Sequence, residues 1–80
     1  MPYAAHVPDQ LSAAVSREVR RLLDERGMSG NALAKATGIP QTSIAGKLRG
    51  ATSFTVDDLD AICRVLEVKV ANLMEWAQRS

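Results

Sequence analysis

The sequence predicts an all-α domain of five helices, and three observations lead to this fold class. Apolar residues recur at three- and four-residue spacing in several segments, as on one face of a helix. Glycine or proline separates these segments where helices usually end or begin. No segment alternates apolar and polar residues between turns as a β-strand does. A chain of 80 residues is long enough for one small domain.

The first helix is expected from Asp9 to about Arg26, where one apolar stripe repeats at helical spacing. The stripe consists of Leu11, Val15, Val19, Leu22 and Leu23. Asp9 is the candidate N-cap, and Gly27 is the expected stop because glycine enters the left-handed region at little cost. Residues 1–8 contain two prolines and no periodicity, so they are expected to form a flexible N-terminal arm ahead of the domain at 9–80.

The second and third helices are short and are joined by a glycine and a proline. Ser29 is the expected N-cap of a helix over about 30–37, and Gly38 ends that helix. Pro40 disfavours helical backbone at the preceding residue but suits a first helical turn. The third helix is therefore expected over about 40–49.

Two further helices complete the expected fold. Thr55, with Asp58 three residues later, forms a variant of the capping box at the start of a helix over about 56–66. The last helix is expected over about 69–78. The inward residues of these two helices are predicted to be Leu59, Ile62, Cys63, Leu66, Val70, Leu73 and Ala77.

The composition excludes several classes of function. One cysteine and one histidine cannot form an internal disulfide or a structural zinc site. His6 lies on the arm and Cys63 on an apolar helix face, so no enzyme, metal, cofactor or small-molecule substrate is expected. The sequence has no apolar run of transmembrane length and no signal-peptide pattern at its start. These features predict a cytoplasmic protein with no membrane partner.

Charge is distributed unevenly along the chain, although the net charge is only +1. Residues 27–53 contain Lys35, Lys47 and Arg49 and no acid, whereas residues 54–80 contain five acids and three bases. The basic middle of the chain suits an anionic partner.

The third helix has an outer face suited to DNA when Ile44 and Leu48 are placed on its buried side. Thr42, Gly46 and Arg49 then face outward. This face is narrow, polar and made of short side chains, which suits a helix that enters a major groove about 12 Å wide. Glutamine can pair with adenine, and threonine and serine can bond base edges. The predicted base-reading residues are Gln41, Thr42, Ser43 and Gly46.

The segments GMSGNALAKATGIPQTSIAGKLRG and FTVDDLDAICRVLEVKVANLM resemble the lambda-repressor-like, Cro/CI-type (XRE-like) helix-turn-helix family. The resemblance implies a compact five-helix DNA-binding domain in which helices two and three form the helix-turn-helix. It also implies a transcriptional regulator, repressor or Cro-like, that binds a palindromic double-stranded operator as a homodimer, formed in solution or only on DNA. The predicted phosphate contacts are Ser29, Asn31, Lys35, Lys47, Arg49 and Thr52, and Arg17, Arg20 and Arg21 are further candidates.

Five positions depart from the family pattern. Ala45 and Gly46 replace longer polar residues in the third helix, so direct readout is expected to depend on its first turn. Gly30 occupies a slot where the family often has glutamine. Glu67 and Lys69 stand where a turn glycine and a capping serine or threonine are common, so partial merging of the fourth and fifth helices is one expected outcome.

Two alternatives remain open from the sequence. Trp76 either closes the small core or contacts a dimer partner. The alternative function is a protein-interaction module on the same fold, such as an antitoxin or a regulator-docking protein. The acid-free middle of the chain favours DNA.

Overall fold

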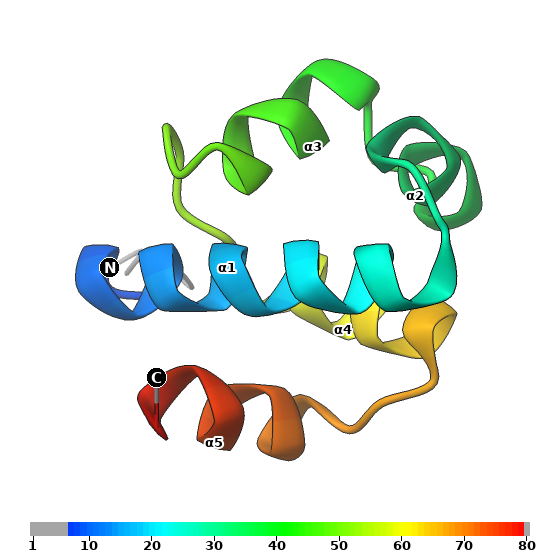
Figure 1. The fold of residues 1–80 in the computed structure, drawn as a ribbon. Helices are drawn as coiled ribbons and strands as arrows, with labels where there is room; N and C mark the ends of the chain where they lie inside the picture. Colours follow the sequence, from blue (N-terminus) through cyan, green and yellow to red (C-terminus); the bar gives the residue numbers. More distant parts are fainter. Residues whose placement is uncertain (1–6, 80) are drawn as a thin grey trace.

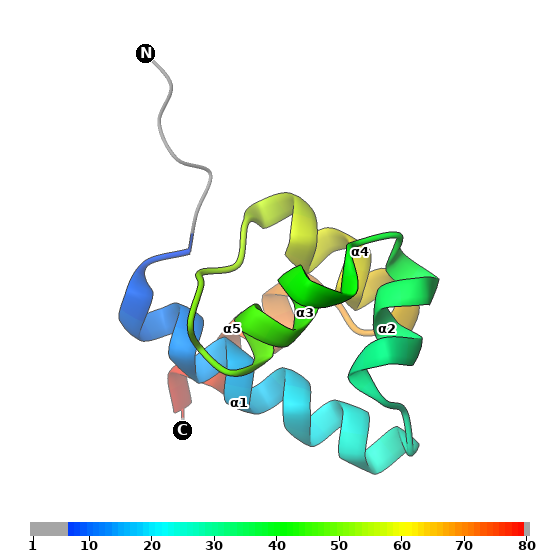
Figure 2. The same cartoon turned by 90° about the horizontal axis from the view of Figure 1, so that it is seen from above.

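The computed structural model describes residues 7–79 and contains five helices (Figure 1). They are α1 (Asp9–Arg26), α2 (Gly30–Thr37), α3 (Gln41–Leu48), α4 (Val56–Leu66) and α5 (Val70–Arg79). The described range contains no extended strand, so the all-α class and the five helices are confirmed. Figure 1 shows α1 between α3 on one side and α5 on the other, and it contacts both. Seen from above, α3 crosses the space between α1 and α4 (Figure 2).

Most helix ends follow the glycines and capping residues that predicted them. Gly27 and Gly38 have φ values of 61° and 78°, which end α1 and α2 in the left-handed region. Ser29 Oγ accepts a hydrogen bond from the Ala32 amide at 3.0 Å at the start of α2. Thr55 and Asp58 form the complete capping box of α4.

The predicted N-cap of α1 is wrong, and the structure specifies two other helix ends that the sequence predicts only approximately or leaves open. Asp9 is the first residue of α1 and not its N-cap, because the N-cap position is held by Pro8. The Asp9 carboxylate instead accepts a hydrogen bond from Ser53 Oγ at 2.9 Å. The third helix starts at Gln41, and Pro40 is its N-cap. The helices α4 and α5 do not merge, because Glu67 adopts φ 60° and ends α4 without a glycine.

The core combines the predicted helix faces with two residues that lie outside every helix. Phe54, in the loop between α3 and α4, is 0% exposed and is the largest fully buried side chain. Val7 is 5% exposed and its amide donates to the Phe54 carbonyl at 2.9 Å. Val7 belongs to the predicted arm at 1–8, so the end of that segment is part of the core. The remainder of that prediction, residues 1–6, lies outside the described residues.

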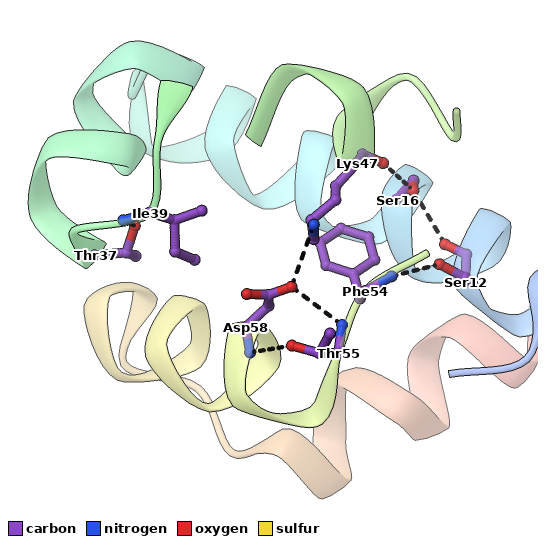
Figure 3. Close-up of polar contacts among 8 residues, drawn as sticks. All are labelled: Ser12, Ser16, Thr37, Ile39, Lys47, Phe54, Thr55 and Asp58. Carbon is purple, nitrogen blue, oxygen red and sulfur yellow. Dashed lines mark hydrogen bonds and ion pairs between the residues drawn. The ribbon is translucent and has the colours of Figure 1, made fainter. Parts of the chain in front are cut away.

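Two buried serines of α1, Ser12 and Ser16, form hydrogen bonds with α3 and with the loop that follows it (Figure 3). Ser12 Oγ accepts a hydrogen bond from the Phe54 amide at 3.1 Å. Ser16 Oγ lies 2.6 Å from the Lys47 carbonyl oxygen and 3.0 Å from that of Ser12, and its single proton serves both. The buried hydroxyl groups of Ser12 and Ser16 are thus hydrogen-bonded, and these bonds hold α3 and the following loop against α1.

Candidate nucleic-acid interface

The helices α2 and α3 form an exposed polar surface beside a shallow groove. We call it the α2–α3 surface and define it by Asn31, Lys35, Gln41, Thr42 and Arg49, all of which are exposed. The groove has a volume of about 350 Å³. Its lining consists of Gly30, Asn31, Gln41, Ile44, Ala45, Leu48 and Arg49.

Gly30 explains how the start of α2 can pack so closely on α3. A Cβ atom at this position would lie 3.3 Å from Leu48 Cδ1 and 3.8 Å from Ile44 Cγ2. A longer residue, such as the glutamine that the family often has there, would therefore meet α3. The close approach leaves Asn31 as the polar side chain of α2 that borders the groove beside Gln41.

The first turn of α3 presents side chains and free backbone amides outward. Gln41 and Thr42 are exposed and Ser43 is half-buried. The first α3 amide that bonds within the turn is that of Ile44, which donates to the Pro40 carbonyl at 3.0 Å. Because the first amides of a helix have no intrahelical acceptor, this end of α3 offers donors to an anion or a base edge.

The cations of the α2–α3 surface are not neutralised by the protein. Lys35 and Arg49 form no ion pair with any described residue. Asn31 and Lys35 are four residues apart, so they share one face of α2. Ser29 and Thr52 are also exposed, and they flank this surface at the start of α2 and after α3. The surface is therefore polar and positive, with no acid between residues 27 and 53.

Gly46 differs from the prediction, because it is buried and does not face outward. The loop after α3 turns back, and the amides of Ala51 and Thr52 donate to the Gly46 carbonyl at 2.9 and 3.4 Å. A Cβ atom at position 46 would lie 3.3 Å from Thr52 Oγ1. The glycine therefore admits the returning loop, and it is not part of the exposed face of α3.

Lys47, a predicted phosphate contact, has an acidic partner within the protein. Its side chain is only 14% exposed, and Nζ lies 3.4 Å from Asp58 Oδ2 at the start of α4. Its side chain runs from α3 to Asp58 (Figure 3). One of the two cations expected at the end of α3 is thus paired inside the protein.

The arginines of α1 divide in the same way. Arg21 donates to Glu18 at 2.8 Å and to Glu25, and the hydrogen bond with Glu18 is the main reason that the pKa of Arg21 is raised. Arg17 and Arg20 are exposed and have no acidic partner among the described residues. The fourth arginine of α1, Arg26, donates to the Leu66 carbonyl at 2.9 Å.

Residues 7–79 contain no cluster of histidine, cysteine and acids that could hold a metal ion. Burial raises the pKa of the Cys63 thiol, and a buried thiol kept protonated is a poor nucleophile. In the same range, no helix is both long and apolar enough to cross a membrane.

Comparison with known proteins decides the family. The sequence profile of the Cro/C1-type HTH DNA-binding domain matches residues 18–78. The chain belongs to this family. The helix-turn-helix of this Cro/C1-type domain is formed by α2 and α3, as the sequence predicts. No curated protein sequence matches the chain.

Solved structures agree with this assignment. The restriction-modification controller protein C.Esp1396I, as a tetramer in complex with its natural 35 base-pair operator, is 28% identical with a TM-score of 0.77, over 86% of this chain and 91% of that one. An HTH_3 family transcriptional regulator from Vibrio cholerae is 25% identical with a TM-score of 0.76, over 85% and 39%. The clp gene regulator ClgR from Corynebacterium glutamicum has a TM-score of 0.80 at 22% identity, over 85% of this chain and 72% of that one. At this identity, the likeness supports the fold and nothing further.

Proposed function

We propose that this Cro/C1-type domain is a sequence-specific regulator that binds double-stranded DNA with α3 in the major groove and acts as a dimer on a palindromic operator. The observation that carries the proposal is the outward first turn of α3, where Gln41 and Thr42 are exposed beside the unpaired Arg49. Gln41 can read adenine, and Thr42 can bond a base edge or touch a thymine methyl group.

The phosphate contacts of the proposal follow from the same surface. Ser29, Asn31 and Lys35 lie along α2, and Arg49 and Thr52 lie at the end of α3 and in its loop. The likeness to C.Esp1396I, which is solved in complex with its operator, supports DNA as the partner. Helix-turn-helix dimers bind half-sites about one helical turn apart, so the proposal includes two copies of α3 in successive major grooves.

The proposal predicts a steep loss of affinity as salt rises. Each phosphate that the protein neutralises contributes about 0.9 to the slope of log K against log salt concentration. About six such contacts would therefore lower the affinity for DNA roughly a thousandfold between 50 and 200 mM salt. Fluorescence anisotropy with a duplex selected from random DNA measures this slope. Near-flat dependence on salt, or no selected sequence, would contradict the proposal and favour the protein-interaction module.

Trp76 provides a test of the dimer because it is the only tryptophan. It is half-buried on α5 and packs against the core. If α5 forms the dimer contact, dilution should shift the emission maximum of Trp76 as the indole ring gains water. An emission spectrum that stays constant over a wide concentration range, with and without operator DNA, would show that Trp76 serves the core alone.

A further inference from the structure

Lys47 is held at both its backbone and its side chain by neighbouring helices. Its carbonyl oxygen lies 2.6 Å from Ser16 Oγ on α1, and its ammonium group lies 3.4 Å from Asp58 Oδ2 on α4. Figure 3 shows the side chain running from α3 to Asp58, with the backbone carbonyl directed at Ser16. A single residue of α3 is thereby joined to both helices that flank it.

The acid that receives the lysine is itself fixed. Asp58 Oδ2 accepts a hydrogen bond from the Thr55 amide at 3.1 Å, and the Asp58 amide donates to Thr55 Oγ1 at 3.0 Å. The Asp58 side chain is 17% exposed. Because this capping box holds Asp58 at the start of α4, the ion pair ties α3 to a rigid point and not to a mobile side chain.

We propose that Lys47 is a positioning residue, which sets the angle of α3 against α1 and α4 and makes no contact with DNA phosphate. The inference rests on the proposed function, in which the first turn of α3 reads the bases. A helix of eight residues is only about 12 Å long, so a tilt at its last turn moves Gln41 and Thr42 at the other end. The ion pair therefore controls readout from inside the protein.

Salt dependence separates a positioning lysine from a phosphate contact. Lys47→Met keeps the aliphatic stem and removes the charge, and Arg49→Met is the matched change at the exposed cation two residues later. We expect Lys47→Met to lower affinity up to roughly tenfold while the slope of log K against log salt stays at the wild-type value. Arg49→Met should lower the slope by about 0.9. A slope that falls by about 0.9 for Lys47→Met, as for a lost phosphate contact, would overturn the proposal.

A second measurement needs no DNA and tests the positioning directly. Asp58→Asn removes the charge but retains an oxygen that can accept from Thr55, whereas Asp60→Asn is a control at an exposed ion pair with Arg64 on the same helix. We expect Asp58→Asn to speed hydrogen exchange of the α3 amides roughly fivefold relative to those of α1. Asp60→Asn should leave this ratio unchanged.

The two measurements fail in different ways. Equal exchange of the α3 amides in wild type and Asp58→Asn would overturn the positioning role even if the protein binds DNA. If the wild type binds no duplex, the proposed function fails, and the exchange ratio still decides whether the ion pair holds α3.

Discussion

Phe54→Ala is expected to lower the free energy of unfolding by about 3–5 kcal/mol, because it leaves a large cavity at the centre of the core. A domain of this size holds only a few kcal/mol of net stability. Most of the chain should therefore be unfolded near 37 °C. Urea titration followed by circular dichroism at 222 nm would measure the loss.

Val56→Ala is the matched control for this substitution. Val56 lies two residues from Phe54 but is 55% exposed, so its truncation should change the free energy of unfolding by less than about 0.5 kcal/mol. A loss below about 1 kcal/mol for Phe54→Ala would show that this ring does not centre the core.

Gln41→Ala is expected to weaken the binding free energy for the preferred duplex by about 1–3 kcal/mol. It should also relax the sequence preference at one base pair. Gln41 has the longest polar side chain in the exposed first turn of α3, and it lines the groove together with Asn31. Affinities measured against a panel of duplexes, each changed at one base pair, would locate the position that Gln41 reads.

Gln78→Ala is the control for Gln41→Ala. Gln78 is an exposed glutamine on α5, which lies on the opposite side of α1 from α3 (Figure 1). This variant should keep the wild-type order of preference among the duplexes. If Gln41→Ala also kept that order and the wild-type affinities, Gln41 would not be a base reader.

The sequence predicts the ends of most helices because the signals are local. Gly27 and Gly38 end α1 and α2 through their own backbone conformation, and Thr55 caps α4 through a residue only three positions away. The end of α4 at Glu67 could not be predicted in this way. A glutamate with left-handed backbone is uncommon, so the residue type itself gives no signal for a helix end.

The candidate site is harder to predict because its side chains respond to distant segments. A helical wheel places Gly46 outward, but the loop that covers it returns only after α3 has ended. The charge of Lys47 suggests a phosphate, and nothing near it in the chain shows that Asp58 comes within reach. Ser16 is a comparable case, since its role depends on α3 packing beside it.

The internal pairing of Lys47 has a consequence for how the domain would search a chromosome. Residence on random sequence grows with the number of backbone charges that a protein neutralises. If Lys47 makes no phosphate contact, as proposed, the exposed cations left near the helix-turn-helix are Lys35 on α2 and Arg49 just after α3, with Arg17 and Arg20 on α1. The domain would then dissociate from non-target DNA faster than it would with Lys47 on a phosphate, and its preference for the operator over random sequence would be correspondingly greater.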